Sequence, residues 1–212
     1  MLPTVLNEND NDYTIAYIDE CGRGPLAFNV CAAVVIWPKD YEPKTKEDEK
    51  LLDLIKDSKK LSAKQREKLS TFIKVNATEY AIATIDNEEI DKINILQATF
   101  KAMHCALEQL KTRIDKIYVD GNKFKPYIGN DGEFIPHTCV VNGDNKLLQI
   151  AAASIIAKQH RDTQMIELHN SDKALQVYGW DTNKGYGTKA HIDAIKQFGK
   201  SKYHRNSFIH FC

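Results

Sequence analysis

The stretch YTIAYIDECGRGPLAFNVCAAVVIW, residues 13–37, decides the fold. Its first part, Tyr13–Ile18, alternates and is rich in β-forming residues, so it predicts a strand that delivers Asp19 at its end. Its last part, Phe28–Trp37, is a continuous apolar run closed by Pro38, which is typical of a buried strand. The two segments are close enough in the chain to form an antiparallel pair.

The segment between these strands carries two adjacent carboxylates, Asp19 and Glu20, followed by Gly22 and Gly24. Neighbouring residues of a strand point to opposite faces of its sheet. Both carboxylates can therefore serve one site only if the chain leaves the strand there, and glycines supply the freedom to turn. We expect the chain to leave the strand at these two residues.

Further strands and helices follow these two strands along the chain. The pattern predicts strands at 80–85, 114–119 and 137–141, and helices at 47–55, from 62, at 94–110, 147–168 and 187–198. Ser62 and Gln65 have the spacing of a capping box, and residues 123–136 read as a surface loop. An early hairpin followed by strands that alternate with helices indicates a mixed α/β sheet with helices on its faces.

Two more aspartates, Asp120 in V-D-G-N and Asp144 in N-G-D-N, follow predicted strands. In α/β folds, sites gather beyond the strand ends. Clustered carboxylates repel one another unless cations neutralise them, and such oxygen ligands select Mg²⁺ or Mn²⁺. Two such ions drive displacement at phosphorus, so the sequence predicts a metal-dependent phosphodiester hydrolase. Taken singly, each aspartate is better explained as a turn residue or a helix N-cap.

Composition bounds the class of protein. The 212 residues carry a net charge of +0 and fit a single domain over 1–212, with a flexible arm at 1–12 that lacks the apolar core of a signal peptide. The five cysteines are odd in number and lack C-x-x-C spacing, which favours a reduced protein of the cytoplasm or nucleus without a zinc site, and we expect the cytoplasm. No apolar run reaches membrane-spanning length, so we expect no membrane partner.

Basic residues gather in two stretches, at 56–68 and 184–205. Basic surfaces that flank a carboxylate centre would suit a nucleic-acid backbone. On charge alone, two solvated helix faces explain the same pattern better.

Seven motifs occur in one order along nearly the whole chain, and together they resemble those of the ribonuclease HII family. They are D-E-C-G-R-G-P-L-A (19–27), D-S-K-K-L-S (57–62), I-N-I-L-Q-A-T (93–99), V-D-G-N (119–122), G-D with A-A-A-S-I-I-A-K and R-D (143–162), K-G-Y-G-T (184–188) and H-R-N-S-F (204–208). The resemblance implies an α/β, ribonuclease H-like fold with a mixed five-stranded sheet flanked by helices. It also implies a small C-terminal helical segment, with residues from about 184 to 212 contacting the substrate.

The same resemblance implies an endonuclease that hydrolyses the RNA strand of RNA/DNA hybrids and cuts 5′ of single ribonucleotides embedded in duplex DNA. The products carry 3′-hydroxyl and 5′-phosphate ends, and catalysis uses two ions of Mg²⁺ or Mn²⁺. The implied metal ligands and catalytic residues are Asp19, Glu20, Asp120 and Asp144. The implied substrate contacts are Gly22, Arg23 and Gly24 at the ribose 2′-hydroxyl, Tyr186 at the following sugar, and Lys59 and Asn94 at the backbone.

Five positions depart from the family pattern, and none of them removes an implied metal ligand. They are Cys21, Phe28, Asn29, Asn142 and Asn183. Nothing in this compact chain points to a partner subunit, so we expect a monomer that binds nucleic acid.

Several alternatives stay open at this stage. A non-catalytic protein that binds RNA/DNA hybrids would tolerate loss of the carboxylates, and a four-carboxylate 3′–5′ exonuclease would show no preference for ribose. A dinucleotide-binding module is weaker, because no G-x-G-x-x-G follows a strand. His204 and Arg205 either bind phosphate or fasten the C-terminal segment, and Asp162 is expected to pair with Lys158 one helical turn away.

Overall fold

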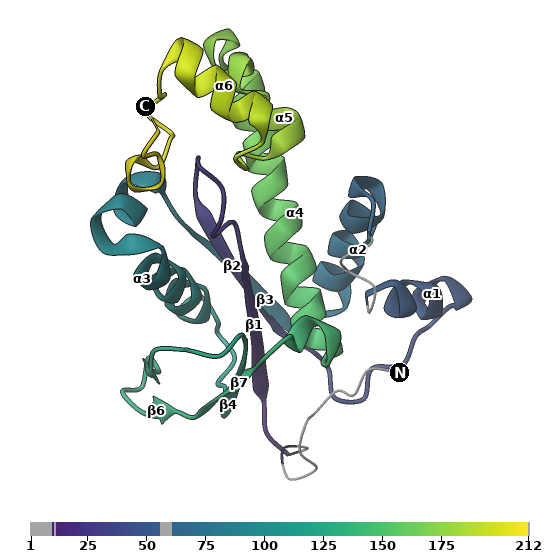
Figure 1. Cartoon of the computed structure of the whole chain (residues 1–212). Coiled ribbons are helices and arrows are strands. Elements are labelled where there is room, and N and C mark those ends of the chain that lie inside the picture. The colour runs from purple at the N-terminus through teal and green to yellow at the C-terminus, as the bar shows by residue number, and fades with distance from the viewer. Residues whose placement is uncertain (1–9, 11, 56–60, 212) are drawn as a thin grey trace.

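A five-stranded mixed sheet forms the centre of the protein, as the computed structural model shows for residues 10, 12–55 and 61–211 (Figure 1). The strand order is β3-β2-β1-β4-β7. β1 pairs antiparallel with β2 and β2 antiparallel with β3, whereas β4 and β7 continue the sheet parallel to β1. The bounds are β1 Ile15–Cys21, β2 Val30–Ile36, β3 Glu79–Ile85, β4 Lys116–Asp120 and β7 His137–Val140. The predicted mixed sheet of five strands is confirmed.

Helices cover both faces of this sheet. Their bounds are α1 Lys46–Ile55, α2 Ala63–Asn76, α3 Asn87–Leu107, α4 Leu148–Ser171, α5 Trp180–Asn183 and α6 Lys189–Phe198, with 3₁₀ turns η3 Gly143–Asn145, η4 Lys173–Tyr178 and η5 Asn206–Phe208. α3 packs on one face, whereas α4, α2 and α1 pack on the other (Figure 1). α5, α6 and η4 form a lobe beside the far end of α4, with an apolar cluster of its own. Within the described ranges, no helix is long and apolar enough to cross a membrane.

The predicted helix starts are right for α2 and incomplete for α3. Ser62 caps α2, and its reciprocal bonds with Gln65 complete the expected capping box. α3 begins at Asn87 rather than at Asn94, because Asp86 accepts a hydrogen bond from the Glu89 amide and caps an extra turn. Asn94 interrupts the helix with φ 66° and ψ 163°. The predicted helix is therefore the second of two segments joined at a kink.

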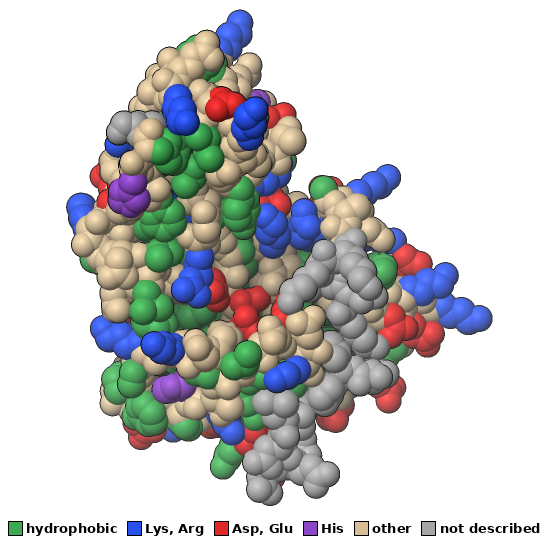
Figure 2. Space-filling view, in the orientation of Figure 1, with side chains coloured by type: hydrophobic (Ala, Val, Ile, Leu, Met, Phe, Trp, Pro, Cys, Tyr) green, Lys and Arg blue, Asp and Glu red, His purple; other side chains and the backbone are tan. Residues whose placement is uncertain are grey.

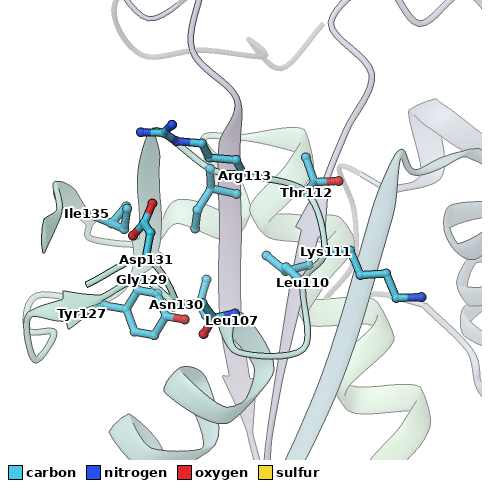
Figure 3. Close-up of a pocket in the computed structure, with 11 residues that line it drawn as sticks. Leu107, Leu110, Lys111, Thr112, Arg113, Tyr127, Gly129, Asn130, Asp131 and Ile135 are labelled. Carbon is cyan, nitrogen blue, oxygen red and sulfur yellow. The ribbon is translucent and has the colours of Figure 1, made fainter. Parts of the chain in front are cut away.

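The segment 123–136 is not the plain surface loop that its sequence suggests. It contains a short hairpin, β5 Tyr127–Ile128 with β6 Phe134–Ile135, and both Tyr127 and Ile135 are buried against the α3 face of the sheet. Strands of two residues are too short to give a periodic signal. A cavity of about 210 Å³ lies between this hairpin and the residues that precede β4, as Figure 3 shows around Arg113 and Tyr127. Arg113 comes before β4 and Asp120 ends it, so this cavity does not coincide with the predicted site.

β1 does not end where the site was expected to begin. The strand continues to Cys21, and Glu20 and Cys21 pair with Ala32 and Cys31 of β2. The prediction that the chain leaves the strand at Asp19 and Glu20 is wrong, because the β2 ladder extends past both carboxylates. Alternation along the strand directs the two side chains toward opposite faces, but both come from the end of β1 and their carboxylates still interact directly at the sheet edge.

Part of the N-terminal segment is attached to the sheet. Residues 1–9 and 11 of the expected flexible arm lie outside the described residues. Asp10 is buried, and its carboxylate accepts hydrogen bonds from the Lys116 ammonium, at 2.9 Å, and from the Tyr118 hydroxyl. Tyr118 also stacks on Tyr17 of β1, with 5.6 Å between the ring centroids.

Candidate active site

Asp19 and Asp120 lie at the same edge of the sheet. β1 and β4 are parallel neighbours, with Tyr17 opposite Tyr118 and Ile18 opposite Val119. Asp19 and Asp120 are the next residues of the two strands, so the register places them side by side on one face. Carboxyl ends of parallel strands meet at one edge of a sheet, which is where sites of this fold class form. The structure thus brings together two of the predicted carboxylates, one buried and one half-buried.

Asp144 is brought to this edge by Gly143. The Gly143 amide donates a hydrogen bond of 2.6 Å to Oδ1 of Asp120. A Cβ at position 143 would lie 2.6 Å from Cδ1 of Ile150 and 3.1 Å from the same Asp120 oxygen. Only glycine therefore lets η3 approach the end of β4 this closely. The next residue, Asp144, is buried.

Glu20 reaches the same region from the α3 face of the sheet. It lines a groove of about 330 Å³ together with Asp120 and residues of α3. Its Oε1 lies 3.3 Å from Nη1 of Arg23, whose side chain is 51 % exposed. The Glu20 end of this pair is 14 % exposed, whereas the Arg23 guanidinium faces solvent and is therefore accessible to a ligand.

The carboxylates of this edge perturb one another. Burial raises the pKa of Asp19 well above its ordinary value, and repulsion from Glu20 and Asp120 raises it further; hydrogen bonds from Ser154 and from the Glu20 amide, at 2.7 Å, oppose this. Burial and Asp120 also raise the pKa of Glu20, against the attraction of Arg23. Figure 2 shows Asp and Glu side chains near the centre of this face, with Lys and Arg side chains around them.

This electrostatic strain is what divalent cations relieve. All four candidate ligands are hard oxygen donors, which suits Mg²⁺ or Mn²⁺. Among the described residues, no three acidic, His or Cys side chains already stand in the arrangement of a metal site. The donor set fits the ions, and binding would draw the carboxylates together.

Two buried arginines hold the chain from Gly22 to Asn29, which contains the turn G-R-G. Arg161 of α4 donates to the carbonyls of Ala27, Asn29 and Lys184 at 2.9–3.1 Å. Arg205 is likewise buried and donates at 2.7–2.9 Å to the four carbonyls of Gly22, Arg23, Phe28 and Asn29. Burial, reinforced by Arg161, lowers the pKa of Arg205 to about 9.

Nothing in the sequence alone distinguishes these two buried arginines from arginines on the surface. The open question about Arg205 is answered, since its guanidinium fastens the turn. We name the two guanidinium groups, of Arg161 and Arg205, the arginine clamp.

Gly22 is the point at which clamp and turn meet. It has φ 86°, and a Cβ there would lie 2.3 Å from Nε of Arg161. Gly24, by contrast, faces Tyr186, whose Cε1 would be 3.7 Å from an added Cβ. The structure therefore brings the turn and the predicted sugar-contacting tyrosine together. Tyr186 is 41 % exposed, as a ring that meets a ligand has to be.

A chain of buried rings holds the Tyr186 loop. The Tyr186 carbonyl only accepts, so Nδ1 of His191 donates to it at 2.9 Å. The Ser201 amide only donates, so Nδ1 of His204 accepts at 2.9 Å. Nε2 of His204 then donates to Nε2 of His191 at 3.1 Å, where the Trp180 indole also donates. Each imidazole thus carries one proton, and burial lowers the pKa of both.

The two residues predicted to contact the nucleic-acid backbone, Asn94 and Lys59, differ in what the structure describes. Asn94 is exposed, and its side-chain oxygen accepts from the amides of Leu96 and Gln97, so it caps the second segment of α3. Leu96 lines the groove that contains Glu20, which places Asn94 near that groove. Lys59 lies outside the described residues.

Three of the departures from the family pattern have structural explanations. Phe28 holds φ 73°, a conformation suited to glycine, while its ring packs into the apolar cluster of the C-terminal lobe. Asn142 has φ 54°, a region that asparagine tolerates. Asn183 accepts from the Gly185 amide at 2.8 Å and donates to the Tyr178 carbonyl at 2.7 Å, so it shapes the loop before Tyr186.

Comparison with known proteins places this arrangement in one family. The family model described as Ribonuclease HII matches residues 16–211. A ribonuclease HII of Parabacteroides distasonis is 50% identical over 192 residues, which cover 90% of this chain and 87% of that protein. The crystal structure of the ribonuclease H2 from Pyrococcus horikoshii superposes with a TM-score of 0.69 at 26% identity, over 92% of this chain and 93% of that one. Bst-RNase HIII in complex with Mn²⁺ shares the fold, with a TM-score of 0.68 at 15% identity over 92% of this chain and 67% of that one.

Proposed function

The chain belongs to the ribonuclease HII family, and from this premise we propose that it is an endonuclease acting on RNA paired to DNA. It hydrolyses the RNA strand of hybrids and cuts 5′ of a single ribonucleotide in duplex DNA, leaving 3′-hydroxyl and 5′-phosphate ends. The observation that carries this proposal is the pairing of Asp19 with Asp120 at the carboxyl edge of neighbouring parallel strands, beside a turn that faces Tyr186.

The family depends on divalent metal ions, and we assign their binding to Asp19, Glu20, Asp120 and Asp144. Mutual repulsion between Asp19, Glu20 and Asp120 supports this assignment, since it costs stability when no cation is present. Two ions of Mg²⁺ or Mn²⁺, when bound, supply Lewis-acid stabilisation of the phosphate oxygens and activation of water. The carboxylates position the ions, and no side chain has to act as a nucleophile.

Recognition of ribose falls to the turn and the tyrosine. Gly22, Arg23 and Gly24 present backbone groups that can hydrogen-bond the 2′-hydroxyl, the group that distinguishes RNA from DNA. Arg205 of the arginine clamp occupies the carbonyls of Gly22 and Arg23, so the turn is pre-shaped before substrate arrives. Tyr186 offers its ring to the next sugar, which lacks the 2′-oxygen. Asn94 and Lys59 remain proposed backbone contacts.

The test is cleavage of a labelled DNA duplex with one internal ribonucleotide, beside all-DNA and RNA/DNA hybrid controls, in Mg²⁺, Mn²⁺ and EDTA. We expect a metal-dependent cut 5′ of the ribonucleotide and no cut in all-DNA. Asp120→Asn should abolish cleavage and leave folding and duplex binding nearly intact, whereas Asp193→Asn, on an exposed position of α6, should cleave normally.

Different outcomes separate the remaining alternatives. Full activity of Asp120→Asn would refute the metal assignment. Binding of hybrid without turnover in either metal would favour the non-catalytic hybrid-binding protein. Cleavage that requires a free end would favour the exonuclease.

We further propose that the protein acts as a monomer in the cytoplasm. The five cysteines without zinc-site spacing support a reducing compartment. A single species of about the mass of one chain, 24.1 kDa, in sedimentation would agree with this, and a stable dimer would refute it.

A further inference from the structure

Three cations gather around one carboxylate between α2, α4 and the loop after α5. Asp162 is buried; Nζ of Lys158 lies 2.7 Å from its Oδ1 and Nη2 of Arg66 3.4 Å from its Oδ2. Lys184 is the third cation. Burial lowers the pKa of its ammonium group, the negative charge of Asp162 opposes this shift, and the positive charges of Lys158 and Arg66 add to it. The Asp181 carboxylate attracts Lys184 as well, so three positive charges face two negative charges and leave an excess of one. We call Arg66, Lys158, Asp162 and Lys184 the cationic cluster.

The excess charge is not needed to satisfy Asp162. The two oxygens of Asp162 already have one cation each. The Lys184 ammonium donates to the backbone carbonyl of Asp181, and the carboxylate of the same residue, which attracts it, is 50% exposed to solvent. Nε of Arg66 is buried and has no hydrogen-bond partner. Partly buried cations without a counter-ion cost free energy, and an arriving anion removes that cost.

The cluster also borders the proposed ribose-reading elements. Nζ of Lys158 lies 5.6 Å from the centroid of the Tyr186 ring, and that ring faces Gly24. Lys158 is 30% exposed and Arg66 16%, so both charges reach the surface. Figure 2 shows Lys and Arg side chains on the surface between the α5–α6 lobe and α2.

We propose that the cationic cluster is a subsite for backbone phosphate of the nucleic acid, next to the sugar that Tyr186 contacts. Arg66 supplies a planar donor that can face two phosphate oxygens, whereas Lys158 and Lys184 act as point charges. Lys158 would fix the position of the phosphate relative to Tyr186, since its ammonium lies against the tyrosine ring. The inference rests on the proposed function and names how the substrate strand is positioned there.

The test removes one negative charge from the substrate backbone and one positive charge from the proposed subsite, separately and together. Duplexes with one ribonucleotide carry a single uncharged methylphosphonate at successive linkages, and KM and kcat are measured for wild type, Lys184→Gln and the control Lys68→Gln. Lys184 is chosen because it makes no ion pair with Asp162. Lys68 is the matched control, since it loses the same charge from an exposed pair with Glu47.

For Lys184→Gln we expect KM about 10-fold higher than for the wild type and kcat within about 2-fold of it. The slope of log binding constant against log salt concentration should be smaller in magnitude by about 1. One or two methylphosphonate positions should raise the wild-type KM by a similar factor and have little further effect in Lys184→Gln. Lys68→Gln should behave as wild type throughout.

Two outcomes would overturn the inference. Lys184→Gln could match Lys68→Gln in KM and salt slope, or every methylphosphonate penalty could add in full to that of Lys184→Gln. In both cases the wild type still cuts at the ribonucleotide, so the subsite fails while the proposed function stands. Absence of cutting by the wild type would instead refute the function itself.

Discussion

Replacing Gly22 with alanine should destabilise the protein far more than replacing Gly24, although the two glycines flank the same residue. Gly22 has φ 86°, and its new Cβ would lie 2.3 Å from Nε and 2.5 Å from Cδ of Arg161. These atoms are mid-chain in a side chain that is fully buried, so they cannot swing away. A Cβ on Gly24 would meet only Cε1 of Tyr186, at 3.7 Å, which is an ordinary contact.

The magnitude follows from what Arg161 loses. Alanine at positive φ costs about 1 kcal/mol. Arg161 donates three hydrogen bonds to backbone carbonyls, and a hydrogen bond from a charged donor contributes roughly 1.5–3 kcal/mol. Losing one of them brings the total for Gly22→Ala to roughly 3–4 kcal/mol, against about 0.5 kcal/mol or less for Gly24→Ala. For a chain of this size the difference is about 10 °C in Tm.

Urea unfolding followed by tryptophan fluorescence measures both variants directly, and thermal unfolding provides an independent check. Cleavage kinetics then separate the two roles, because Gly24→Ala should keep wild-type stability while raising KM through the methyl group placed beside Tyr186. A Gly22→Ala protein as stable as wild type would show that the arginine clamp does not fix the turn. Equal losses in both variants would show that the turn responds to any added side chain.

Two further predictions concern the buried cations and rings behind the site. Arg205→Lys should lose roughly 2–4 kcal/mol, since one ammonium cannot reach four carbonyls, whereas exposed Arg113→Lys should stay within about 0.5 kcal/mol in the same urea titration. Measuring the free energy of unfolding against pH tests the hydrogen-bonded histidines. Burial and the neighbouring His191 lower the pKa of His204 from 6.5 to about 4. Between these two pH values the unfolded chain therefore binds a proton that the native chain does not. Stability from this group is therefore full above pH 6.5 and falls by roughly 2–3 kcal/mol as the pH drops to about 4. His204→Gln should flatten that part of the curve, and an unchanged slope would contradict the neutral network.

The sequence was sufficient for elements whose signal is local. β2 is an unbroken apolar run and α2 begins with a capping box, and both appear as predicted. Asp120 was found because a short motif follows a strand. The hairpin at Tyr127–Ile135 was missed because its strands are shorter than any period, and the kink at Asn94 was missed because asparagine is compatible with both a helix and a cap.

Contacts between distant parts of the chain could not be predicted in this way. Arg205 binds the Gly22 carbonyl across 183 positions of sequence, and Arg161 binds Ala27 across 134. An arginine beside an aspartate or a histidine in a motif looks the same whether it meets phosphate or supports a turn. Only burial separates the two: both guanidinium groups are inaccessible, so they support the turn and do not bind the ligand themselves.

The continuation of β1 past Asp19 changes how the four carboxylates can act together. Asp19 contacts Ser154 of α4 on one face of the sheet, whereas Glu20 lines the groove on the α3 face. Asp120 raises the pKa of both, so it lies within electrostatic reach of each face. A metal centre built from these residues would therefore lie at the sheet edge, with Asp120 beside Asp19 and within electrostatic reach of Glu20. Because Asp120 acts on both Asp19 and Glu20, we expect its replacement to disturb the proposed metal centre as a whole.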